Sequence, residues 1–167
     1  YLLNLDNYNF FATDFRVRYK PNGVYLINQI INFNFFQIDL FNFYFIPELI
    51  TGLLLKIFPD DKFFSLTSNL LNIFLLFLSF NFFFKSIIKK NINLAIFIFL
   101  IFFFLYIGNW IWCFWKLADV YFLFIFSIIF YFLCEGIKQK KIDYIIYSLI
   151  LTFVSLLTKP QGIIIFP

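Results

Sequence analysis

Two carboxylates and two guanidinium groups lie close together near the start of the chain. Asp6 and Asp14 are eight residues apart, and Arg16 and Arg18 follow the second of them. On a helix, that spacing turns by about 800°, so the carboxylates would point within roughly 80° of each other. A carboxylate can accept the proton of an attacking hydroxyl, and an Arg side chain can bind a phosphate. The structural alternative is a solvated loop with surface ion pairs.

Two further charged residues stand at the ends of apolar segments. Asp119 precedes one such segment, where a carboxylate can also simply favour the positive end of a helix dipole. Lys159 follows another and could face a phosphate. In the alternative interpretation, the Lys159 side chain only extends to the lipid headgroups.

The composition determines what kind of elements must position these groups. Of the 167 residues, 63% are hydrophobic, 26% are aromatic and 13% are charged, and the mean hydropathy is +0.89. Soluble domains are typically about 25% charged. The composition therefore excludes a soluble enzyme, a nucleic-acid-binding module and a disordered tail, and it predicts a membrane protein. Nucleic acid is not an expected partner.

Long apolar segments predict the membrane-spanning helices. A span needs about 20 apolar residues to cross about 30 Å of hydrocarbon. The segments that qualify are about 63–84, 92–112, 118–134 and 144–158, with the start of another at 162. We expect the third to end at Glu135-Gly136, because a glycine there is typical of a helix stop. The predicted fold is all-α, a polytopic transmembrane helical bundle comprising residues 63–167.

Lysines between the spans predict the orientation. Lys85, Lys89 and Lys90 follow the first span, and Lys138, Lys140 and Lys141 follow the third. Positive loop residues favour the cytoplasmic side. The net charge of +4 is therefore explained by topology, and residues 1–62, Asp119 and Lys159 are expected on the outer side.

Residues 1–62 form an outer loop that carries interfacial helices. Val24 to Phe36 and Ile46 to Phe58 mix apolar and polar residues in a way that fits helices in the interface plane. Turns are predicted at Lys20-Pro21-Asn22-Gly23 and at Phe58-Pro59-Asp60-Asp61. In the alternative, Asp39 to Phe58 spans the membrane, buries Glu48 and moves residues 1–35 to the cytoplasm.

Four short motifs follow one another in a recognisable order. They are Asp6-Asn7-Tyr8 through Ala12 and Asp14, Pro47-Glu48-Leu49 through Phe58, Leu117-Ala118-Asp119, and Leu156 to Gly162 with its Lys-Pro turn. Their order, spacing and common side resemble the GT-C class of integral-membrane glycosyltransferases, which use polyprenyl-phosphate sugars. The resemblance covers most of the chain. The resemblance is strongest to the aminoarabinose-transferase-like and rhizobial galacturonosyltransferase-like branches of this class. The chain also resembles dolichyl-phosphate-mannose mannosyltransferases.

This resemblance implies transfer of a sugar from a polyprenyl-phosphate donor to a lipid, glycan or protein acceptor of the cell envelope. It implies Asp6 or Asp14 as the catalytic base, and leaves open which, because Asp6-Asn7 stands in place of two adjacent acids. It further implies donor-phosphate binding by Arg16, Arg18 and Lys159, with Tyr8, Asp119 and Gln161 as other site residues. The expected location is a bacterial inner membrane, with the site on the periplasmic face. No cofactor is certain, although a divalent metal ion is allowed.

Other membrane functions compete with this interpretation. A transporter or flippase would place ionisable residues near span centres and would break its helices. An O-antigen polymerase or ligase would depend on a different outer loop, and a purely structural membrane subunit would leave Asp6 to Arg18 unexplained. Because the chain has no Met and stops within the apolar run 163–166, we expect an N-terminal fragment of a larger membrane domain.

Overall fold

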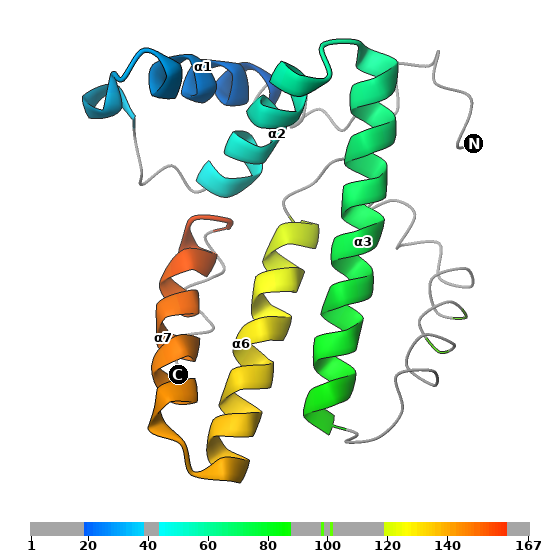
Figure 1. The fold of residues 1–167 in the computed structure, drawn as a ribbon, viewed down its shortest axis with the longest axis vertical. Coiled ribbons are helices and arrows are strands. Elements are labelled where there is room, and N and C mark those ends of the chain that lie inside the picture. Colours follow the sequence, from blue (N-terminus) through cyan, green and yellow to red (C-terminus); the bar gives the residue numbers. More distant parts are fainter. Residues whose placement is uncertain (1–18, 39–43, 88–97, 99–100, 102–118, 160–167) are drawn as a thin grey trace.

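The computed structural model describes residues 19–38, 44–87, 98, 101 and 119–159. The elements are α1 (Lys20–Ile31), the 3-10 helix η3 (Phe35–Gln37), α2 (Phe45–Ile57), α3 (Asp61–Ile87), α6 (Asp119–Gln139) and α7 (Ile142–Leu156). All regular structure in these described ranges is helical, so the predicted all-α class is confirmed. Figure 1 shows α3, α6 and α7 as an upright bundle, with α1 and α2 at one of its ends.

Two of the described helices are long and apolar enough to cross a membrane, namely α3 and α6. Only 33% of the most apolar window of each is buried, unlike the core helix of a soluble protein. The third upright helix, α7, has 15 residues, which rise about 22 Å and so fall short of about 30 Å of hydrocarbon. The predicted span 92–112 and the start of another at 162 lie outside the described residues, apart from residues 98 and 101.

The bundle buries small polar side chains beside an apolar cluster that includes Leu75 and Val120. Ser79, Ser127, Ser148 and Thr152 are fully or almost fully buried. The hydroxyls of Ser148 and Thr152 donate hydrogen bonds to carbonyls of their own helix. Large apolar side chains are exposed instead, including Phe63, Leu66, Leu70, Phe74, Ile142, Ile146, Ile150 and Phe153. Buried small and hydroxyl residues are typical of membrane helix interfaces.

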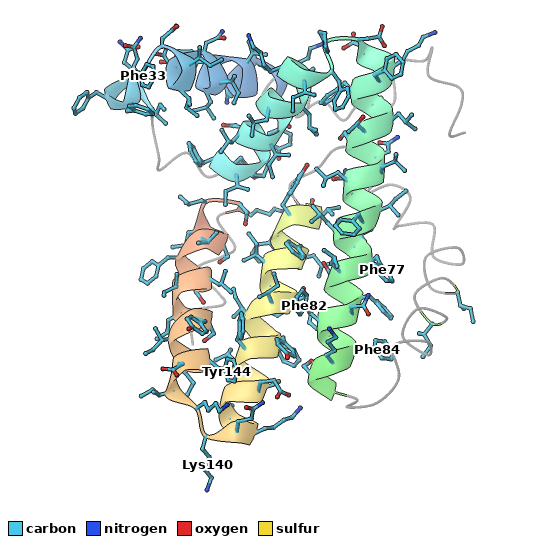
Figure 2. The ribbon with its side chains drawn as sticks, in the orientation of Figure 1. Phe33, Phe77, Phe82, Phe84, Lys140 and Tyr144 are labelled. Carbon is cyan, nitrogen blue, oxygen red and sulfur yellow. The ribbon has the colours of Figure 1, made fainter. Side chains whose placement is uncertain are left out.

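The directions of the helices put the lysines at one end of the bundle. Figure 1 shows that α3 and α6 run in the same direction and that α7 returns alongside α6. The Lys138 ammonium donates a hydrogen bond to the Ser86 carbonyl, so the ends of α6 and α3 meet. Lys140 also lies at this end, away from α1 and α2 (Figure 2). Two helices separated in sequence by one membrane-spanning helix run in the same direction, so parallel α3 and α6 are compatible with the predicted span 92–112.

Two predicted helix boundaries are wrong, because residues that signal turns lie inside helices. The predicted turn at Lys20-Pro21-Asn22-Gly23 is the first turn of α1, where proline is well tolerated because the amide it lacks has no helical partner. The predicted stop at Glu135-Gly136 lies inside α6, which continues to Gln139. A Cβ at Gly136 would lie 3.1 Å from Ile145 Cγ1 and 3.3 Å from Tyr144 Cβ. Both glycines serve helix packing rather than chain reversal.

The second predicted interfacial helix is present as α2, and it is oblique to the upright helices of the bundle. In Figure 1, α2 runs obliquely between α1 and the nearby ends of α6 and α7. It has 13 residues, or about 20 Å of helix, so the alternative in which Asp39 to Phe58 spans the membrane would need residues beyond this helix. Residues 39–43 of that alternative lie outside the described part of the chain.

Candidate functional site

Asp119 and Lys159, predicted as separate site residues, form an ion pair. Asp119 is the first residue of α6, and Lys159 lies just beyond α7, with its backbone N–H bonded to the Ser155 carbonyl at 3.2 Å. The pair is accessible, because the side chains are 33% and 21% exposed, respectively. An ammonium held by a partly exposed carboxylate can exchange it for another anion at little cost. The structure thus gives Asp119 a specific partner beyond the helix dipole.

Helix α2 is attached to the same end of the bundle. The Ile46 N–H donates a hydrogen bond of 2.9 Å to the Leu157 carbonyl, two residues before Lys159. On the next turn of α2, Ile50 packs against a cluster that includes Leu75 of α3 and Val120 of α6. The start of α2 therefore lies beside the helix ends that carry the ion pair.

A buried carboxylate lies one turn into α2. The side chain of Glu48 is completely buried, and its Oε1 accepts a hydrogen bond of 2.9 Å from Asn22 Nδ2 of α1. In the sequence, Glu48 belongs to the Pro47-Glu48-Leu49 motif, but it is not among the predicted site residues. The signal that could have found it is its position in a largely apolar helix, since burying a charge is costly unless it is hydrogen-bonded.

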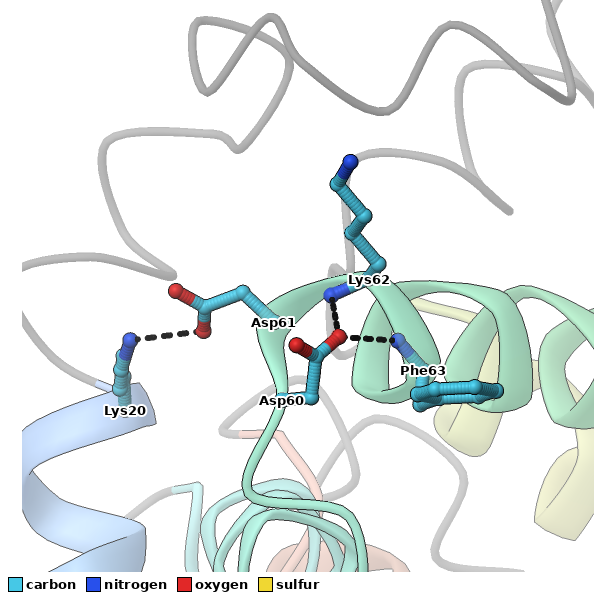
Figure 3. A network of polar contacts seen from close by, with 5 residues as sticks. All are labelled: Lys20, Asp60, Asp61, Lys62 and Phe63. Carbon is cyan, nitrogen blue, oxygen red and sulfur yellow. Dashed lines mark hydrogen bonds and ion pairs between the residues drawn. The ribbon is translucent and has the colours of Figure 1, made fainter.

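The first residues of α1 are held against α3. Tyr19 is buried and packs in a cluster with Phe64 and Tyr44, the two tyrosine rings lying 5.6 Å apart. The Lys20 ammonium lies 3.2 Å from an Asp61 carboxylate oxygen (Figure 3). In the same view, the Asp60 carboxylate accepts hydrogen bonds of 2.9 and 3.2 Å from the N–H groups of Lys62 and Phe63. Asp60 thereby caps α3, as a side chain before a helix commonly does.

The other predicted site residues are not placed by this structure. Asp6, Tyr8, Asp14, Arg16, Arg18 and Gln161 lie outside the described residues. Of the predicted set, Asp119 and Lys159 are therefore the two whose positions are established, and the structure brings them together. Within the described ranges, no group of three or more Cys, Asp or Glu side chains could hold a metal ion.

These features define a helical protein with two apolar helices of spanning length and a polar end covered by two short helices. Comparison with known protein families, curated proteins and solved structures finds no match. Its activity must therefore be inferred from the residues and their geometry.

Proposed function

We propose that the protein is a multi-pass membrane glycosyltransferase that moves a sugar from a polyprenyl-phosphate donor to an acceptor of the cell envelope. The site lies at the end of the bundle that α1 and α2 cover. In this proposal the end carrying Lys85, Lys138 and Lys140 faces the cytoplasm, and the covered end faces the outside. The whole protein resides in the cell membrane.

One observation carries this proposal: the Asp119–Lys159 pair stands at the end of the apolar bundle, beneath a short oblique helix. A lipid-linked phosphate approaches from the bilayer with its charge at the membrane surface, so its binding site needs a cation beside an apolar wall. Lys159 supplies that cation. When the donor binds, its phosphate would replace the Asp119 carboxylate as the partner of the Lys159 ammonium, so that the ammonium stays paired with an anion.

The chemistry needs a base and further cations, which we assign to residues before α1. Asp6 or Asp14 accepts the proton of the acceptor hydroxyl as that oxygen attacks the sugar carbon, and the bond to the donor phosphate breaks. Arg16 and Arg18, with Lys159, stabilise the departing phosphate. Tyr8 and Gln161 complete the proposed site.

The transporter alternative is less well supported by the described helices. Residues 63–84 of α3 and 120–134 of α6 contain no Asp, Glu, Lys or Arg, and both helices run without interruption. Transport pathways typically place ionisable groups and helix breaks at those depths. Charges here gather at the ends, as chemistry at the membrane surface requires.

The test is a transfer assay on the full-length chain in proteoliposomes, with a panel of polyprenyl-phosphate sugars and an extract of envelope lipids and glycans as acceptors. We expect release of polyprenyl phosphate from one donor. Lys159→Ala should raise the KM for that donor about tenfold or more, because a charge-assisted hydrogen bond contributes roughly 1.5–3 kcal/mol. Lys159→Arg should retain more donor binding than the alanine variant.

The matched control is Lys20→Ala, which removes an exposed lysine at the same end of the bundle and should leave the KM unchanged. An unchanged KM in Lys159→Ala would remove Lys159 from the site. Failure of every donor to release polyprenyl phosphate in the presence of the acceptors would contradict the glycosyltransferase proposal itself.

A further inference from the structure

The buried carboxylate of Glu48 lies where α1 and α2 cross. A Cβ at Gly23 would lie 2.5 Å from the Glu48 carbonyl oxygen and 2.8 Å from the Gly52 nitrogen, so the two backbones touch at this point. The Asn22–Glu48 hydrogen bond of 2.9 Å is one residue away from Gly23 and one helical turn away from Gly52. The crossing therefore combines a backbone contact, which fixes the distance between the helices, with a polar contact, which fixes their rotation.

Each helix of this pair has its own attachment to the bundle. The start of α2 is held by the Ile46–Leu157 hydrogen bond and by the packing of Ile50. The start of α1 is held by Tyr19 in its aromatic cluster and by the Lys20–Asp61 ion pair. The ion pair is 44% and 33% exposed and contributes little. The Asn22–Glu48 hydrogen bond counts for more, because losing a partner of a fully buried polar side chain costs more free energy than losing an exposed contact.

We propose that Glu48 is a positioning residue, which acts through Asn22 to hold α1 in one orientation on α2. Tyr19, directly before α1, follows in sequence on residues 1–18, to which the proposed function assigns several site residues. Glu48 itself does not react with the substrate. The assignment of residues 1–18 to the site rests on the proposed function, whereas the Asn22–Glu48 contact stands without it.

The role predicts different outcomes for two substitutions of similar size. Asn22→Leu removes the donor and leaves the Glu48 carboxylate without this hydrogen bond. Glu48→Gln removes the charge but keeps a side-chain oxygen that can accept from Asn22. If Glu48 positions α1, the orientation of α1 is lost in Asn22→Leu and kept in Glu48→Gln. If Glu48 were instead a catalytic base, Glu48→Gln would lose transfer activity.

The experiment is hydrogen–deuterium exchange of the full-length chain in nanodiscs, read by mass spectrometry on peptides from residues 20–31 in the absence of any sugar donor. We expect exchange about tenfold faster in Asn22→Leu, with Glu48→Gln close to the native chain. Lys20→Ala is the control for the exposed ion pair, and it should change exchange little.

Transfer by the same variants separates the positioning role from the proposed function. We expect a lower kcat in Asn22→Leu and retained activity in Glu48→Gln. Unchanged exchange in Asn22→Leu, or exchange in Glu48→Gln as fast as in Asn22→Leu, would overturn the positioning role. Loss of transfer in Glu48→Gln with native exchange would also overturn it, by making Glu48 catalytic. If no variant and no native chain shows transfer, the exchange data still decide the role of Glu48.

Discussion

Lys140 occupies a backbone conformation that usually belongs to glycine. Its φ is 54°, in the left-handed region, and the N–H of the next residue, Lys141, donates a hydrogen bond of 3.2 Å to the Gly136 carbonyl. This bond closes the turn from α6 into α7. A left-handed residue after a helix is common, but a side chain there costs free energy that glycine avoids. The lysine keeps a positive charge at the end of the bundle, at the expense of local strain.

Lys140→Gly should therefore stabilise the protein by about 1 kcal/mol, through relief of the strained φ. The measurement is the thermal unfolding midpoint of the purified chain in detergent. Lys140→Ala is the matched control, because it removes the same charge while keeping a Cβ, and its midpoint should not rise. Equal increases in both variants would assign the effect to the charge and contradict the strain argument.

At the scale of elements, the covered end of the bundle depends on one close helix crossing. A Cβ added to Gly52 would overlap the carbonyl oxygen of Gly23 and lie 2.7 Å from Ile27 Cγ1. Backbone atoms cannot move aside as a flexible side chain can, so α1 and α2 would have to separate. The crossing of α6 and α7 at Gly136 is looser, since the nearest atom lies 3.1 Å away and belongs to a side chain.

Gly52→Ala should destabilise the α1–α2 pair by about 1–3 kcal/mol, the usual cost of overpacking. The readout is limited proteolysis of residues 20–58 in nanodiscs, where the variant should be cut faster than the native chain. Leu53→Ala is the control at the neighbouring position on the same helix, because Leu53 is an exposed side chain. Native proteolysis rates in Gly52→Ala would show that the two helices do not cross as closely as described.

At the scale of the whole molecule, the charges of the described residues divide between the two ends of the bundle. Lys85, Lys138, Lys140 and Lys141 lie at one end, near the contact of Lys138 with Ser86. Lys20, Asp61, Asp119 and Lys159 lie at the other, where they form two ion pairs. The first end carries an excess of positive charge, and the second is close to neutral. This asymmetry is what the positive-inside rule uses to orient a membrane protein.

The orientation predicts which end a membrane-impermeant thiol reagent can reach in intact cells. In a background with Cys113 and Cys134 replaced by Ser, a cysteine in place of the exposed Asn28 of α1 should be labelled from outside. One in place of the exposed Gln139 at the end of α6 should be labelled only after the cells are opened. Both substitutions leave every lysine in place, so the charge bias is unchanged. Labelling of position 139 alone in intact cells would reverse the orientation.

Much of the helical framework follows from the sequence, because local properties determine it. The run 63–84 is long and apolar enough to predict a helix of spanning length, and α3 extends it by two residues at its start and three at its end. Ile46 to Phe58 likewise predicts α2 within one residue. The errors at the start of α1 and within α6 come from Pro21, Gly23 and Gly136, whose residue types signal turns. The helix predicted at Val24 to Phe36 also ends early, at Ile31, and Phe35–Gln37 form a separate 3-10 helix. A glycine can end a helix, or it can allow a second helix to pack closely against the first. Which of the two occurs depends on the position of the second helix, and the local sequence does not specify that position.

The chemistry of the site divides in the same way. Residue types and order alone indicate a membrane protein, identify Asp119 and Lys159 as unusual charges, and predict that both lie on one side. Only the tertiary structure pairs these two residues, which are 40 positions apart, because the pair exists where the start of α6 meets the end of α7. Only the tertiary structure buries Glu48 against Asn22, because that contact depends on two glycines allowing two backbones to touch. Charge and hydropathy are properties of the residues and can be read from the sequence. Contacts and burial depend on how the helices pack against one another, which only the tertiary structure shows.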